Sequence, residues 1–294
     1  MWLDEIQINS RADGFDNDRN RQINEVFAAA FGKDLSNLEP SAASKLAELY
    51  KSFNFGVSTM ALKVAGFRAS DDSTGATFSI GDTHLDISFD GTKDLVGIKI
   101  GLGATAIAAP SAKMQELLPQ RINLDIRLDE FPMRELIAEF LDGLGDTTVA
   151  ANENTNGTKD LSPMLGQLDF KKSLSEANSK LILKDLGIST GTARIASNGS
   201  VIANSSAVYG IVGTLDATIW GLDELIRITA ERARRDPSLQ GVQGILGLMK
   251  MYAKPHPATG GASPSYKFHV EQRLDGTITI NDAPLQIGAA GNRR

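Results

Sequence analysis

The sequence contains no cysteine, and this absence excludes thiol catalysis, thiolate metal sites and disulfide frameworks together. It has only 3 histidines, His84, His256 and His269, and none of their spacings is typical of a metal site, so we expect neither a metal nor another cofactor. There is no excess of positive charge, because 30 lysines and arginines stand against 36 aspartates and glutamates. The resulting net charge of −6 argues against nucleic acid as a partner.

Long apolar runs are also missing, and no stretch reaches the ~18 apolar residues that a transmembrane helix needs. The first five residues do not have the character of a signal peptide. What the sequence does have is length and apolar content. With 294 residues, 41% of them hydrophobic, the chain is able to bury a core in one large domain or two modest ones.

Apolar residues recur at helical spacing in five segments. The strongest pattern follows Pro132, which suits a first helical turn, and consists of Met133, Leu136, Ile137, Phe140, Leu141 and Leu144. The other expected helices cover residues 46–53, 161–168, 222–233 and 238–253.

Between these helices, apolar and polar residues alternate, which is typical of strands with one buried face. The cleanest example is residues 122–129, and further alternating segments cover residues 60–64, 78–80, 85–89 and 96–102. The dipeptides Asp90-Gly91, Asn198-Gly199 and Asp275-Gly276 favour tight hairpins between antiparallel strands. The sequence therefore predicts an α+β fold in which long, curved antiparallel sheets pack on amphipathic helices.

Residues 145–160 carry almost no apolar side chains and indicate a linker. We therefore expect two similar lobes, residues 1–150 and 151–294, each a β-meander with helices. Residues 62–67 resemble 183–188, and similar segments follow in the same order in both halves. This order indicates either an internal duplication or one continuous sheet, and both interpretations stay open.

The segment Gly187-Ile188-Ser189-Thr190-Gly191 fits the G-x-S-x-G pattern of serine hydrolases. Asp223, followed by His256 or His269, would complete a triad in the right chain order. The pattern requires a helix after the serine, however, and residues 191–206 have no helical period. We expect a turn at the end of a strand and assign no catalytic residue.

Two other motifs resemble ligand sites only in part. Residues 101–106 fit a loose dinucleotide fingerprint, but Pro110 interrupts the helix that should follow, so we expect a strand rich in small residues. The acidic residues near Asp16 lack the loop pattern of an EF-hand, and we expect them to cap a helix.

Residues 239–252 are apolar nearly all round and include three glycines, which cost a helix about 1 kcal/mol each. We expect close packing on the sheet or a pocket wall to offset that cost. A cavity between sheet and helices would then be lined by Phe140, Trp220, Ile245, Leu248 and Met249. The preceding arginines, Arg232, Arg234 and Arg235, form either a solvated helix end or a site for an anionic lipid headgroup.

Two segments resemble a known family. They are residues 213–218, which lead through Gly221-Leu222 into a helix, and the closing residues 274–285. Both are similar to poorly characterised proteobacterial envelope proteins with AsmA-like β-rich repeats, and the likeness covers mainly residues 160–288. It implies a mature periplasmic protein that handles lipid or supports the envelope, with a signal or anchor removed, and it implies no catalytic residue.

From these patterns we expect a non-catalytic periplasmic protein that binds a lipid or another apolar small molecule, in lipid transport or envelope maintenance, with transient contact to the inner membrane. One alternative is a serine hydrolase that uses Ser189. Another is an envelope scaffold or interaction module that uses exposed sheet edges. The sequence leaves the ligand, the direction of transport and the oligomeric state open.

Overall fold

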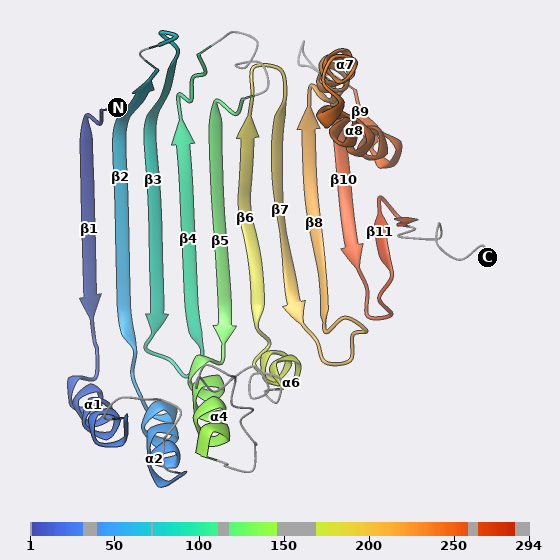
Figure 1. Ribbon diagram of the computed structural model, residues 1–294. Helices are drawn as coiled ribbons and strands as arrows, with labels where there is room; N and C mark the ends of the chain where they lie inside the picture. The colour runs from blue at the N-terminus through green and yellow to red at the C-terminus, as the bar shows by residue number, and fades with distance from the viewer. Residues whose placement is uncertain are drawn as a thin grey trace, which may run out of the picture.

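The computed structural model describes residues 2–31, 40–71, 73–110, 118–145, 169–257 and 264–285. Within these residues the chain forms one antiparallel sheet of 12 strands, with helices gathered at the strand ends (Figure 1). The expected α+β class with a long antiparallel sheet is therefore confirmed. The sheet is open and does not close into a barrel.

The strands follow one another across the sheet in chain order. The order is β1 to β8, then β10, β11 and β12, with β9 paired to β10. From β1 to β8, each strand pairs with the next strand along the chain. Asp90-Gly91 and Asp275-Gly276 lie at hairpin connections as expected, but the turn expected at Asn198-Gly199 is wrong, because both residues lie inside β7 and pair with β8. The strands are β1 (Glu5–Asp13), β2 (Gly56–Ser70), β3 (Thr77–Gly91), β4 (Val96–Thr105), β5 (Arg121–Phe131), β6 (Lys180–Ser189), β7 (Arg194–Ala203), β8 (Ile211–Trp220), β9 (Lys254–His256), β10 (Ser265–Gln272), β11 (Ile278–Ile280) and β12 (Ala283–Pro284).

The expected division near residue 150 falls in residues 146–168, outside the described ranges. The strands on either side of it, β5 and β6, are hydrogen-bonded neighbours, paired from Arg121 opposite Ser189 to Asp129 opposite Lys180. The segments 1–150 and 151–294 therefore share one sheet. Internal duplication stays a prediction, since a continuous sheet is compatible with it.

A β-bulge in β6 keeps four of its apolar side chains on one face of the sheet. Leu181 and Leu183 have odd numbers, whereas Leu186 and Ile188 have even ones, so a regular strand would place the two pairs on opposite faces. The register with β5 shifts at Lys184, and this extra residue returns all four apolar side chains to the same face.

The helices lie at two ends of the sheet. In Figure 1, α1, α2, α4 and α6 lie at one end of the strands, and α7 and α8 at the other end beside β8 and β10. Four of the five expected helices are confirmed wholly or in part, and residues 161–168 lie outside the described ranges. The helices are α1 (Asn17–Phe31), α2 (Pro40–Lys51), α4 (Met133–Gly145), α6 (Phe170–Glu176), α7 (Leu222–Ala233) and α8 (Gln240–Tyr252).

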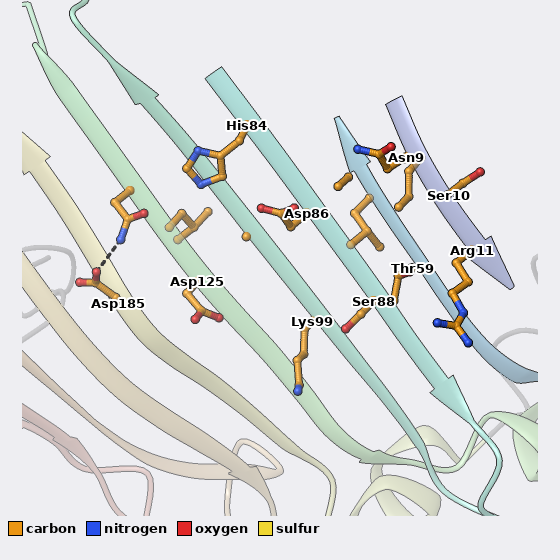
Figure 2. A pocket seen from close by; sticks show the side chains of 16 residues that line it. Asn9, Ser10, Arg11, Thr59, His84, Asp86, Ser88, Lys99, Asp125 and Asp185 are labelled. Carbon is orange, nitrogen blue, oxygen red and sulfur yellow. Dashed lines mark hydrogen bonds between the residues drawn. The ribbon is translucent and has the colours of Figure 1, made fainter. Parts of the chain in front are cut away.

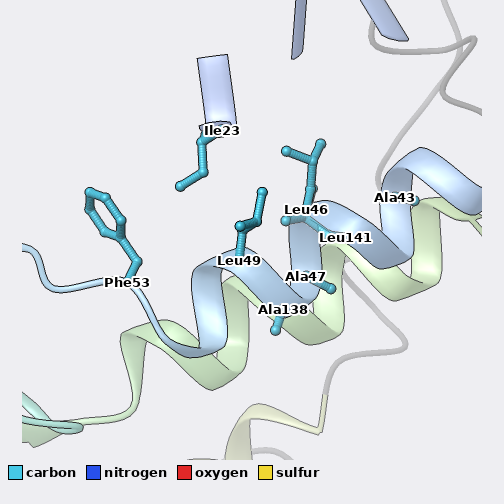
Figure 3. Packing of buried hydrophobic residues seen from close by; sticks show 8 residues of the cluster. All are labelled: Ile23, Ala43, Leu46, Ala47, Leu49, Phe53, Ala138 and Leu141. Atoms are coloured by element: carbon cyan, nitrogen blue, oxygen red, sulfur yellow. The ribbon is translucent and has the colours of Figure 1, made fainter. Parts of the chain in front are cut away.

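The first three of these helices form a hydrophobic core of their own (Figure 3). Small side chains at Ala43 and Ala47 of α2 and at Ala138 of α4 are all buried, and they allow the two helices to pack closely. Leu46 is fully buried beside them, and Ile23 from α1 belongs to the same cluster. This core therefore lies among helices at the ends of the strands.

Two contacts join this helical core to the sheet. The ring of Phe55 meets Phe53 edge-on at 4.8 Å between centroids and Phe89 of β3 at 6.1 Å. The guanidinium of Arg134, at the start of α4, donates to Asp94 Oδ1 and to the carbonyl oxygen of Gly91, both at 2.8 Å. The connection between β3 and β4 is thereby fixed against α4.

The arrangement differs from the expectation that the sheet packs over the helices around a cavity. Leu46 and Leu141 are buried against other helices, so these apolar stripes are not available to the middle of the sheet. A second cluster, in which Leu222 of α7 and Leu246 of α8 meet Ile219 and Phe268, packs on the sheet only near the ends of β8 and β10.

We predict that Leu46→Ala lowers the free energy of unfolding by about 2–5 kcal/mol, because it leaves a cavity in a core that is fully closed at this position. Urea unfolding followed by circular dichroism measures the change. The exposed neighbour Lys45 is the matched control, and Lys45→Ala should shift stability by no more than about 0.5 kcal/mol. Equal effects of the two substitutions would contradict the assignment of this core.

Candidate functional site

One face of the sheet is apolar from its first strand onward, because the register aligns apolar side chains across neighbouring strands. Two rows of side chains cross the strands, one from β1 to β6 and the other from β2 to β6, and together we name them the apolar rows. The first consists of Ile8, Leu62, Leu85, Leu102, Leu124 and Leu186. The second consists of Met60, Ile87, Ile100, Ile126 and Leu183.

The apolar rows are open to solvent. Every side chain in them is exposed or half-buried, and Ile8 at the sheet edge is 67% exposed. A one-sided antiparallel sheet ordinarily buries its apolar face against a second layer. Uncovered apolar surface of this extent is typical of an interaction or ligand-binding site. The apolar rows are therefore the strongest candidate site in the described residues.

The opposite face of the sheet is polar and carries a shallow hollow of about 590 Å³ (Figure 2). His84, Asp86, Lys99 and Asp125 are among its lining residues. Small residues on the neighbouring strands create the space: a Cβ at Gly103 would lie 2.1 Å from Cε1 of the His84 ring, so the imidazole rests where a side chain would otherwise stand.

The polar hollow has no arrangement that points to chemistry. Asp125 lies opposite Asp185 across β5 and β6, and Asn123 Nδ2 donates to Asp185 Oδ2 at 2.5 Å. Nowhere in the described ranges do three or more histidine or acidic side chains gather closely enough to hold a metal ion. We interpret this face as the solvated side of the sheet.

Helix α8 lies at one end of the apolar face and carries a second apolar surface. Its inner side chains Leu246 and Met249 pack with the sheet, whereas Ile245, Leu248 and Met251 are 57–67% exposed. The three glycines of α8 have open space around them, since an added Cβ at any of them would meet nothing within 4 Å. We expected close packing on the sheet or a pocket wall to offset the cost of these glycines to the helix. The open space around them shows that neither reason applies. None of the described helices is both long enough and apolar enough to cross a bilayer.

The five expected ligand-binding residues do not gather at one site. Phe140 belongs to α4 and lies at the opposite end of the strands from α8. Trp220 follows Ile219, which packs under α8, so the indole points to the polar face, where the Arg194 guanidinium lies 5.1 Å from its centroid. Only Met249 packs against the apolar face of the sheet, and Ile245 and Leu248 point away from it.

Sequence reasoning missed the residues of the apolar rows as a candidate site. Their alternation is the signal, but alternation by itself predicts a buried strand face. The signal does not show whether another layer covers that face, because coverage depends on where distant helices pack.

Ser189 lies at the end of β6, and β7 begins at Arg194, so the expected strand-end turn is confirmed. The cross-strand pairs run from Ser189 through Arg194, Trp220 and Ser265 to His256. Four strand spacings of about 4.8 Å separate the serine from that imidazole by about 19 Å. His269 is three strands from β6 and is bound to Asp216 Oδ1 at 2.8 Å, and His84 is three strands away on the other side. The sheet therefore keeps every histidine away from the Ser189 hydroxyl.

A polar network fixes α8 to α7 and to the sheet. Lys250 Nζ lies 2.6 Å from Asp223 Oδ1, and the Tyr266 hydroxyl donates to Asp223 Oδ2 at 2.6 Å. The hydrogen bonds from Lys250 and Tyr266 lower the pKa of Asp223, and the same contacts raise the pKa values of Lys250 and Tyr266. The position of α8 at the end of the apolar face therefore depends on the ionised carboxylate.

We predict that Asp223→Asn lowers the melting temperature near neutral pH and that its effect shrinks in acid. Because the folded-state pKa of Asp223 is depressed, its stabilisation is present above the ordinary value of about 4 and is lost as pH falls through the lower folded-state pKa. Thermal melts of both proteins between pH 3 and pH 7 measure the difference. A difference that stays constant over this range would contradict the prediction.

Comparisons of the chain with family models, with curated proteins and with solved structures found no match. The resemblance to AsmA-like envelope proteins stays a prediction, and the function has to be argued from the geometry of the sheet.

Proposed function

We propose that the protein binds the acyl chains of a lipid, or an apolar small molecule of similar shape, along the apolar rows. The observation that supports this most is that the rows run without a polar interruption from β2 to β6 while remaining open. Each CH₂ group withdrawn from water onto such a surface contributes about 0.8 kcal/mol. Five strand spacings give the longer row a length of about 24 Å, enough to lie along an extended chain.

The composition of the rows favours an aliphatic ligand over a protein partner. Their side chains are leucine, isoleucine and methionine, with no tryptophan, tyrosine or arginine among them. Protein interfaces usually depend on those three residue types for their strongest contacts. A smooth aliphatic surface instead provides non-directional contact, which suits chains of variable length.

The proposal includes transient contact of α8 with a membrane surface. Ile245, Leu248 and Met251 form an exposed apolar stripe, and Arg234 and Arg235 are exposed just before the helix. Apolar side chains beside cationic ones suit the surface of an anionic bilayer. Because α8 also packs on the sheet through Leu246, a lipid leaving the bilayer would meet the apolar face there.

The periplasmic location and a role in lipid transport or envelope maintenance also belong to the proposal, and they rest on the resemblance to AsmA-like proteins. The proposed function is non-catalytic, because the register gives Ser189 no imidazole partner.

We predict that Ile100→Glu weakens binding of a fluorescent fatty acid about tenfold or more, because it puts a carboxylate in the middle of the apolar rows. Fluorescence titration measures the dissociation constant, and lipid extraction with mass spectrometry detects any co-purified lipid. Lys99→Glu is the matched control, since the adjacent side chain of the same strand points to the polar face.

The control should bind as the wild type does, and circular dichroism should show the same fold in both variants. Wild-type protein that binds no fatty acid would refute the proposed function. Equal loss in both variants would show that the apolar rows are not the site.

We predict that Ile245→Glu combined with Leu248→Glu reduces binding to vesicles containing phosphatidylglycerol about tenfold, because the exposed stripe loses its apolar character. Vesicle flotation measures the bound fraction. Gln243→Glu, with the new charge on an exposed polar position of α8, is the control and should retain most of the binding. Flotation that is unchanged by the double substitution would exclude α8 as the membrane contact.

A further inference from the structure

The two edges of the sheet differ in length and protection. At one edge β11 and β12 have 3 and 2 residues, so they offer little backbone for pairing. At the other edge β1 has 9 residues, all exposed, paired with β2 in unbroken register. β1 has no proline or bulge, two of the usual features that protect an edge, although Glu5, Arg11 and Asp13 are charged. Among the described strands, β2 is the only one paired with it.

The outer side of β1 presents regularly spaced backbone groups. Trp2 and Arg68 exchange two backbone hydrogen bonds of 3.0 Å, and the N–H of Asp4 donates to Ala65 at 3.2 Å. The Ala65 carbonyl therefore points toward β1. Because Ala65 is paired with Glu5, the odd-numbered residues of β1 direct their backbone groups toward β2. Because these groups alternate along an antiparallel strand, those of Ile6, Ile8 and Ser10 point to the open edge.

Charges on β1 are complementary in one self-paired register. If two antiparallel β1 strands are related by a two-fold axis at Ile8, Glu5 of each copy lies opposite Arg11 of the other. The two Ile8 residues then form a hydrogen-bonded pair at the axis, and Gln7 of each copy lies opposite Asn9 of the other. Moving the axis to Asn9 would instead place Glu5 opposite Asp13, and like charges at opposed positions are destabilising.

In one copy these charges have only weak partners. Arg11 is paired with Asp13 two residues along the strand, but their side chains are 80% and 57% exposed. Such an ion pair contributes little. Glu5 accepts a hydrogen bond of 2.6 Å from the Gln7 amide. In the self-paired register, Arg11 would keep Asp13 and gain Glu5 of the second copy.

We infer that β1 is a dimerisation strand, which pairs antiparallel with β1 of a second copy about a two-fold axis through Ile8. A two-fold axis normal to the sheet leaves both apolar faces on the same side, so the two sheets become one continuous sheet. The inference does not rest on lipid binding, because the edge geometry and the charge pattern support it independently.

Cysteine cross-linking tests the register, because the chain has no cysteine of its own. In Ile8→Cys the two thiols would face each other in a hydrogen-bonded pair with Cα atoms about 5.5 Å apart, within the range for a disulfide. Mild oxidation should give a covalent dimer on a non-reducing gel. In Ala12→Cys, an exposed position on the same side of β1, the two thiols would be about 27 Å apart and should not react. Equal cross-linking of both variants, or of neither, would overturn the inference.

Charge reversal gives a second test on the full chain. Glu5→Arg alone and Arg11→Glu alone should each raise the dimer dissociation constant about tenfold, and the double substitution should restore it. Sedimentation velocity measures this constant. At about 100 μM protein, dimerisation with a millimolar dissociation constant would already be visible. Wild-type protein that is monomeric at this concentration would refute pairing through β1. A dimer that is insensitive to both charge reversals would refute it as well. Binding of the fluorescent fatty acid by the single-reversal variants, measured in parallel, separates this result from the lipid-binding proposal.

Discussion

The whole structure depends on the cross-strand register, which sends alternate side chains to two different faces. Each strand is polar on one side and apolar on the other, and each pairs with its neighbour in sequence so that like sides coincide. A slip of one residue in any strand would reverse its two faces. The bulge at Lys184 shows the strength of this constraint, because an extra residue in the sequence is left out of the ladder to keep the apolar face continuous.

In the described residues, both clusters of buried hydrophobic side chains lie near the strand ends. One core joins α1, α2 and α4, and the second joins α7 and α8 to β8 and β10. Arg134 and Phe55 hold the first core to the sheet, and the Asp223 network holds α8 over the second. The middle of the sheet is stabilised mainly by backbone hydrogen bonds and by contacts along the apolar rows, which explains how that surface stays available to a ligand.

Local pattern was sufficient to predict most of the elements and the division of each strand into two faces, as in residues 122–129 of β5. It could not predict which surfaces touch. Phe140 and Leu248 were expected in one cavity, yet they lie at opposite ends of the strands, because helix positions depend on long-range packing. The Ser189 motif had the right chain order for a triad, but distance across the sheet is set by strand count, and the intervening strands separate the groups.

The nearest-neighbour order of the strands gives this protein an almost one-dimensional architecture. From β1 to β8, every strand pairs with the next strand along the chain and repeats the same half-polar, half-apolar design. Such a sheet can be widened or narrowed by whole hairpins without redesign of the remainder, as in solenoid proteins. The width of the ligand-facing surface would then depend on the number of strands and could change in evolution without a change in the helices at the strand ends.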